Sequence, residues 1–151
     1  MDKAEKAKAL FMQGANCAQA VFGAFASECG ITEEQALIMS SGFGGGVGRM
    51  REVCGAVSGM VLVLNMIYGS GDLSDKNAKD GQYARIQAVA GAFKEQCGSI
   101  VCRELLGLDK KDATPAVSEE RTAAYYKKRP CAELVALAAE ITEKYLADNP
   151  K

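Results

Sequence analysis

The sequence predicts an all-α protein, a single-domain helical bundle of about six to seven helices around a buried central helix. Apolar residues recur at helical spacing in several segments, and glycines or capping residues separate these segments. Alternating apolar and polar runs, which would indicate strands, are nearly absent. No repeat and no linker divides the chain, so we expect one domain over residues 1–151.

Three helices are expected before the glycine-rich middle of the chain. Residues 3–13 are rich in alanine and lysine, which favour a helix. Asn16 can cap a second helix over residues 17–29. Thr32 and Gln35 have the spacing of a capping box, which predicts a third, short helix after them.

A glycine cluster separates these helices from the most apolar part of the sequence. Five glycines lie within residues 42–48, where they disfavour a helix. Residues 53–68 are apolar on nearly all sides, which predicts the buried central helix. Ser74 or Asp75 can cap a longer helix over residues 76–96.

The carboxyl-terminal third predicts three further helices. A short helix is expected over residues 100–106, followed by a polar connector over residues 109–117. Another helix is expected over residues 118–128. Pro130 then lies where proline is favoured, in the first turn of the last helix, residues 131–146.

The composition excludes several function classes. The chain has 18 basic and 19 acidic residues, so it lacks the field expected of a protein that binds nucleic acid or an acidic membrane. Its most apolar stretch, residues 56–68, is shorter than the roughly 20 residues of a membrane span. Histidine is absent, which excludes Ser–His and Cys–His nucleophile pairs and imidazole metal ligands.

The amino terminus is charged and leads into no apolar core of signal-peptide length. We therefore expect a soluble, cytoplasmic protein. In a reducing compartment its six cysteines are more often thiols, metal ligands or redox groups than structural disulfides.

Four of the six cysteines fall in the first turn of four predicted helices. These helix-start cysteines are Cys17, Cys54, Cys102 and Cys131, with Ser99 as the expected cap before Cys102. The first turn of a helix presents free N–H groups and the positive end of its dipole, and both favour a thiolate. We therefore expect lowered thiol pKa values and, where the helix starts converge, a redox or metal site.

The other two cysteines are placed differently. Cys29 and Cys97 lie at predicted helix ends and are each followed by a glycine. We expect them to be core residues, because free cysteine is often buried as a small apolar side chain.

The helix-start cysteines and their neighbours resemble the C_GCAxxG_C_C family of redox-active proteins over about residues 14–139. The matching segments are Asn16-Cys17-Ala18, Cys54-Gly55-Ala56-Val57-Ser58-Gly59, Gly98-Ser99-Ile100-Val101-Cys102 and Pro130-Cys131-Ala132. One departure is that Val53 precedes Cys54, where the family label has glycine. The resemblance implies a small helical protein with redox or metal chemistry.

The first functional hypothesis is a metal centre held by all four helix-start cysteines. Four thiolates are the usual ligands of an iron–sulfur cluster or another thiolate-bound metal. The glycine-rich segments before and after Cys54 would let backbone N–H groups approach the cofactor, with Gly45, Gly46 and Gly55 as the expected cofactor-binding residues. The identity of the metal stays open.

The second hypothesis is thiol–disulfide exchange without metal, with Cys54 as the attacking thiol because Arg49 and Arg51 precede it. No resolving cysteine can be assigned. The third is a non-catalytic helical binding module whose cysteines only pack. An oxidoreductase and an electron-transfer protein both stay open, as do the redox partner and a homodimer.

Overall fold

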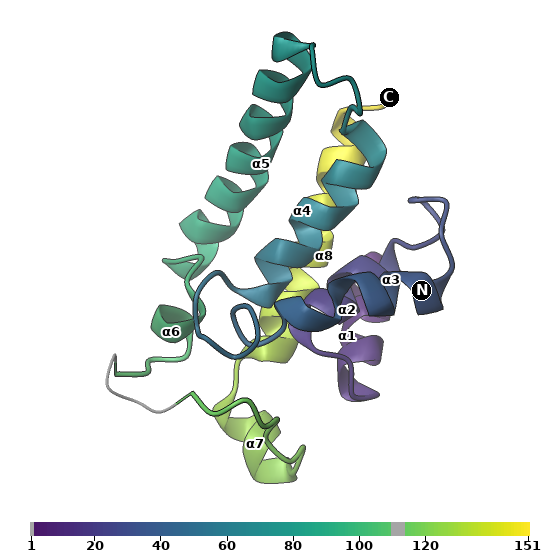
Figure 1. Cartoon of the computed structure of the whole chain (residues 1–151). Helices are drawn as coiled ribbons and strands as arrows, with labels where there is room; N and C mark the ends of the chain where they lie inside the picture. Colours follow the sequence, from purple (N-terminus) through teal and green to yellow (C-terminus); the bar gives the residue numbers. More distant parts are fainter. Residues whose placement is uncertain (1, 110–113) are drawn as a thin grey trace.

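The structure, a computed structural model, describes residues 2–109 and 114–151, and its regular structure is helical (Figure 1). These residues form eight α-helices and a 3₁₀ turn: α1 (Lys3–Met12), α2 (Cys17–Ala24), α3 (Glu33–Ser40), η1 (Ser41–Phe43), α4 (Gly55–Tyr68), α5 (Lys76–Cys97), α6 (Cys102–Leu105), α7 (Ala123–Lys128) and α8 (Cys131–Asp148). The all-α prediction is confirmed. Part of the predicted polar connector, residues 110–113, lies outside the described residues.

Side-chain caps fix where three helices begin. The Asn16 side chain accepts a hydrogen bond from the Gln19 N–H, and the Gln19 side chain accepts one from the Asn16 N–H. Thr32 and Gln35 form the same reciprocal pair at α3. Asp75 caps α5. The cap at Asn16 matters most for the site, because it sets Cys17 as the first residue of α2.

Two helix boundaries differ from the prediction. Helix α2 ends at Ala24 instead of residue 29. Phe25 and Ala26 stay buried in the turn that follows, so the apolar periodicity of the sequence continues past the end of the helix. Helix α7 begins at Ala123, after its cap Thr122, and not at Ser118.

A third correction concerns the start of α6. Val101, not Ser99, is its N-cap residue, and the helix begins at Cys102. Residues before it pair with another segment of the chain: Val53 and Val101 form an isolated antiparallel bridge. Ser99 instead accepts from the Val101 N–H and donates to Glu104.

The helices pack into one domain with α4 in contact with α2, α5 and α8. Helix α1 packs on α8 and α2, so the amino- and carboxyl-terminal parts of the chain meet (Figure 1). Burial on α4 is concentrated in its first half, whereas Met66 near its end is 41% exposed. The buried half is the end that carries Cys54, which therefore lies inside the domain. None of the helices in the described ranges is long and apolar enough to cross a membrane.

Candidate functional site

The structure brings the four helix-start cysteines together around one cavity of about 330 Å³. Cys17, Cys102 and Cys131 are the first residues of α2, α6 and α8, and Cys54 is the N-cap residue of α4. Cys54 and Cys102 are buried, whereas Cys17 and Cys131 are partly exposed. We call this cavity the cysteine pocket. The predicted cofactor-binding glycines also line it: Gly45, Gly46 and Gly55.

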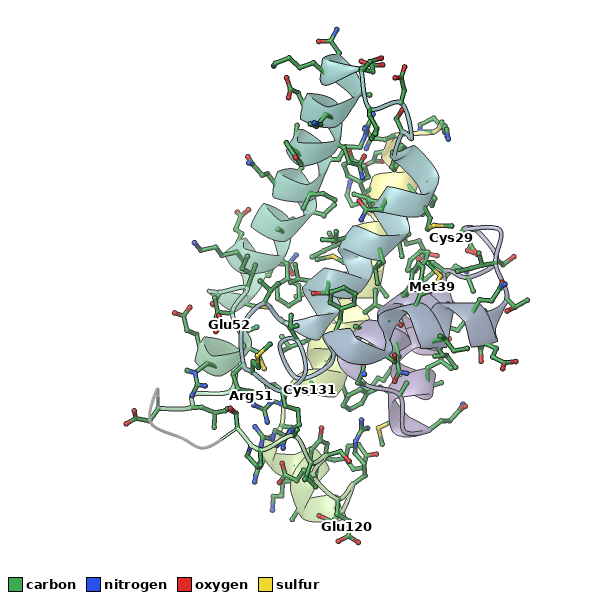
Figure 2. All side chains as sticks on the ribbon, in the orientation of Figure 1. Cys29, Met39, Arg51, Glu52, Glu120 and Cys131 are labelled. Carbon is green, nitrogen blue, oxygen red and sulfur yellow. The ribbon has the colours of Figure 1, made fainter. Side chains whose placement is uncertain are left out.

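The remaining two cysteines lie outside the cysteine pocket. Cys29 and Cys97 are partly buried and pack against the hydrophobic core. Figure 2 shows Cys29 on a different side of the molecule from Cys131 and Arg51. Burial raises the pKa of Cys29 to about 11, with Glu28 adding to the effect. Neither cysteine therefore joins the candidate site.

Two glycines of α4 let this helix approach α2 closely. A Cβ atom on Gly59 would lie 2.7 Å from the Val21 Cβ. A Cβ atom on Gly55 would lie 3.1 Å from the Cys17 Cβ. The first turns of the two helices, which carry Cys17 and Cys54, can pack together because neither glycine has a side chain.

A short backbone pairing fixes Cys54 relative to Cys102. The Cys54 N–H donates to the Ile100 carbonyl over 2.8 Å, and the Cys102 N–H donates to the Glu52 carbonyl over 2.6 Å. These bonds flank the Val53–Val101 bridge. They satisfy backbone donors at the helix starts that carry the two cysteines. Sequence reasoning missed this pairing, for which the β-branched residues on both sides are a weak signal.

The segment between η1 and α4, residues 44–51, is the glycine loop, and it packs against the start of α6. Its backbone is left-handed at several positions, which include Val47, Arg49 and Arg51 as well as glycines. A Cβ atom on Gly46 would lie 2.7 Å from the Cys102 Cβ and 2.6 Å from the Glu52 nitrogen. Glycine is therefore required at this position for the loop to reach the pocket. Left-handed backbone at non-glycine residues is strained and is often found at functional sites.

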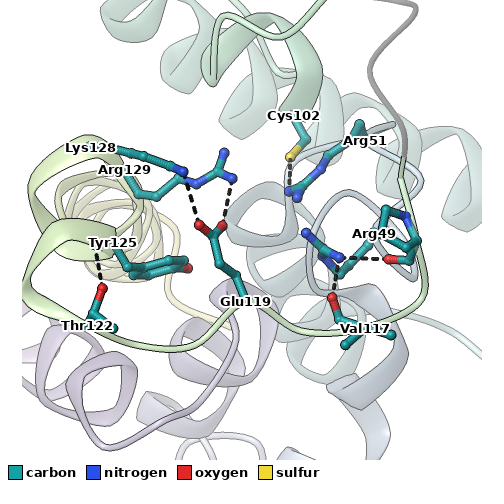
Figure 3. A network of polar contacts seen from close by, with 10 residues as sticks. Arg49, Arg51, Cys102, Val117, Glu119, Thr122, Tyr125, Lys128 and Arg129 are labelled. Carbon is teal, nitrogen blue, oxygen red and sulfur yellow. Dashed lines mark hydrogen bonds and ion pairs between the residues drawn. The ribbon is translucent and has the colours of Figure 1, made fainter.

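Arg121 ties the connector before α7 to the amino-terminal helices. Its guanidinium donates to the carbonyls of Phe11 and Ala15, over 2.8 and 2.9 Å, and lies over the Phe11 ring. The same connector is held by Glu119, which pairs with Lys128 and Arg129 (Figure 3). These contacts keep residues 118–122 out of a helix and bring the connector onto the pocket.

Cys17 and Cys131 both line the pocket, and each affects the pKa of the other. In this interaction the Cys17 thiol acts as hydrogen-bond donor and the Cys131 sulfur as acceptor. This hydrogen bond lowers the pKa of Cys131 to about 7, and the nearby Arg129, Arg51 and Arg121 lower it further against the effect of burial. The same hydrogen bond holds the pKa of Cys17 well above its ordinary value, as does its burial. Of the two, Cys131 is therefore the thiol that ionises near neutral pH, while Cys17 keeps its proton.

The expectation of lowered pKa values at all four helix starts is wrong for the others. Burial raises the pKa of Cys54 to about 12, although the N–H groups of Ala56 and Val57 donate to its sulfur. Burial also raises the pKa of Cys102, although Arg51 donates to its sulfur over 3.6 Å. For both cysteines, burial destabilises the thiolate because it loses contact with water. The hydrogen bonds from the backbone N–H groups and from Arg51 compensate for only part of this loss.

Within residues 2–109 and 114–151, no three cysteine or carboxylate side chains lie close enough together to share one ion. A tetrahedral zinc site holds each sulfur about 2.3 Å from the metal, so its thiolates nearly touch one another. An iron–sulfur cluster distributes its four thiolates over two or four irons, so the ligands as a set span a larger space.

A family model and a curated relative match the chain. A family model described as "Putative redox-active protein (C_GCAxxG_C_C)" matches residues 15–145. The chain belongs to the C_GCAxxG_C_C family. Among its relatives is a protein of Archaeoglobus fulgidus, described as an uncharacterized protein, which is 29% identical over 99% of both chains. No solved structure matches the chain.

The part of the chain that matches the C_GCAxxG_C_C family includes every residue that lines the cysteine pocket except Phe11. All four helix-start cysteines lie within residues 15–145, as do the glycine loop and Arg121. Arg121 is the pocket arginine that sequence reasoning missed. Arg49 and Arg51 precede Cys54 in the sequence and are expected to act on it, whereas the position of Arg121 depends on contacts with residues more than 100 positions away.

Substitution of Cys17 tests the hydrogen bond to Cys131. In Cys17→Ala the donor is lost, so the pH midpoint for alkylation of Cys131 by iodoacetamide is expected to rise from about 7 by about one unit or more. Cys17→Ser keeps a hydroxyl donor and should shift the midpoint less. Peptide mass spectrometry gives the rate at Cys131 as a function of pH. An unchanged midpoint in Cys17→Ala would show that the two side chains do not interact.

Proposed function

We propose that the cysteine pocket is a thiol–disulfide redox site in which Cys131 is the attacking thiol and Cys17 the resolving thiol. The observation that carries the proposal is that both cysteines begin their helices at the same cavity, with the lowered pKa of Cys131 as support. A thiol with a pKa near the ambient pH combines a large thiolate fraction with good nucleophilicity. The pair is also the more accessible half of the four cysteines.

The reaction has two steps. The Cys131 thiolate attacks one sulfur of a substrate disulfide, forms a mixed disulfide and releases the other half of the substrate as a thiolate. The Cys17 thiol then gives up its proton to solvent and attacks the Cys131 sulfur, which releases the second thiolate. The protein loses two electrons and gains one disulfide bond, and the substrate disulfide is reduced to two thiols.

Cys54 has a different part in this proposal from the one expected from the sequence. Its pKa of about 12 leaves it protonated at neutral pH, and its side chain is buried. Cys102 is buried as well, and its pKa is also raised. We assign both to the wall of the pocket in this reaction. A cytoplasmic location suits it, because a reducing compartment regenerates the dithiol.

Trapping of the mixed disulfide tests the proposed roles. Cys17→Ser protein treated with bis(2-hydroxyethyl) disulfide is expected to retain one half of the reagent on Cys131, because no resolving thiol remains. The wild-type protein should instead form the Cys17–Cys131 disulfide and retain none. Cys29→Ser is the matched control and should behave like the wild type. Peptide mass spectrometry without reductant identifies the products, and an adduct on Cys54 or on no cysteine would refute the assignment.

A second candidate function is an iron–sulfur cluster or other metal centre held by all four helix-start cysteines. It is favoured by the fact that four thiols from four helices line one cavity, together with several arginines that can balance negative charge. Such a centre would supply one-electron transfer when bound. The glycine loop would bring N–H groups toward its sulfurs.

Metal analysis and a visible absorption spectrum of protein prepared without air decide between the two candidates. The dithiol proposal predicts a colourless protein with fewer than about 0.1 metal ions per chain, because thiols alone do not absorb visible light. A brown protein with iron and inorganic sulfide would establish the cluster, and loss of the colour in Cys54→Ser and Cys102→Ser, but not in Cys97→Ser, would identify its ligands.

A further inference from the structure

Arg51 is a buried charge without a carboxylate partner in the described part of the chain. Its side chain lines the cysteine pocket, and the residue is only 8% exposed. Its guanidinium donates to the Cys102 sulfur over 3.6 Å, and no salt bridge involves it among residues 2–109 and 114–151. A buried guanidinium without a carboxylate beside it is costly unless another anion accompanies it.

The whole cavity carries an excess of positive charge. Its charged lining consists, in the described residues, of Arg49, Arg51, Arg121, Arg129 and Glu119. The single carboxylate is already occupied, because Glu119 accepts from Arg129 over 2.9 Å and from Lys128 over 3.0 Å. These two contacts hold the pKa of Glu119 at about 2, so it remains charged but is not available to Arg51.

Two other arginines are positioned by neutral groups. Arg49 donates to the carbonyls of Pro115 and Val117 (Figure 3). Arg121 donates to the carbonyls of Phe11 and Ala15. Backbone carbonyls orient a guanidinium without neutralising it. Arg49 and Arg121 are therefore held in place around the pocket by groups that carry no negative charge.

The glycine loop adds uncharged donors to the same lining. The N–H groups of Gly45 and Gly46 have no hydrogen-bond acceptor among the described residues, although both residues line the pocket. Both residues have left-handed backbone, and consecutive N–H groups in such turns commonly bind anions. The cavity is of the size that encloses a small molecule.

We propose that the cysteine pocket binds small disulfides that carry a carboxylate group, with Arg51 as the residue that receives the carboxylate. The Gly45 and Gly46 N–H groups complete the anion site. The carboxylate is bound next to Cys102 while the substrate sulfur faces Cys131, so the site selects among disulfides by charge. This inference rests on the proposed thiol–disulfide function and names the substrate class of that site.

Three disulfides of similar length test the charge selection. They are 3,3′-dithiodipropionate, bis(2-hydroxyethyl) disulfide and cystamine, which carry negative, neutral and positive ends. The wild-type protein should be oxidised by the anionic probe about tenfold faster or more than by the neutral one, and most slowly by cystamine. The rate of formation of the Cys17–Cys131 disulfide is measured at one pH by mass spectrometry.

Two arginine variants locate the effect. In Arg51→Gln the ratio of the anionic to the neutral rate should fall about tenfold, and Arg51→Lys should restore part of it. The ratio of the two rates isolates the effect of the charge on the probe, because both probes react with the same Cys131 thiolate. Arg85→Gln is the matched control, since Arg85 stacks on Tyr68 away from the pocket, and its ratio should equal that of the wild type.

Sulfate competition keeps the test decisive even when Arg51→Gln does not fold. In the wild-type protein, sulfate should slow oxidation by 3,3′-dithiodipropionate more than oxidation by the neutral probe. Equal rates for the anionic and neutral probes in the wild type, or equal effects of sulfate on both, would overturn the anion site. A protein that no probe oxidises between Cys17 and Cys131 would instead overturn the thiol–disulfide function on which it rests.

Discussion

Close contact between backbones is the constraint on which the cysteine pocket depends. The helix starts can meet only where no side chain separates them, and the chain has glycine at the three decisive contacts: Gly46 against α6, and Gly55 and Gly59 against α2. A methyl group at any of them would lie about 3 Å or less from a neighbouring atom of the packed segment. The glycine-rich character of this part of the sequence thus has a specific role, which is to bring four thiols from distant parts of the chain to one cavity.

Within the pocket, burial and hydrogen bonding decide the state of each thiol more than helix position does. All four cysteines are at helix starts, yet only Cys131 has a lowered pKa. The difference is that Cys131 receives a hydrogen bond from Cys17 and lies near three arginines, whereas Cys54 is too deeply buried for its two N–H donors to compensate. The result is an asymmetric site with one reactive sulfur and three protonated neighbours, which suits a reaction that needs one nucleophile at a time.

Much of the fold could be predicted from local signals. The caps at Asn16 and Thr32 and the left-handed Gly98 that ends α5 follow from the chemistry of single residues and their neighbours, and the structure has all three. The placement of the cysteines at helix starts followed from the same signals. Contacts between distant segments could not be predicted in this way, because the position of Arg121 and the pairing before Cys102 depend on how the helices pack.

Four sulfurs from four helices share one cavity in this structure, whereas the other two cysteines lie outside it. A crystal structure with sulfur anomalous scattering measures this directly. We predict anomalous peaks for Cys17, Cys54, Cys102 and Cys131 around a single cavity, with Cys17 and Cys131 adjacent, and peaks for the other two cysteines elsewhere. Peaks for the four helix-start cysteines in separate parts of the core would contradict the account.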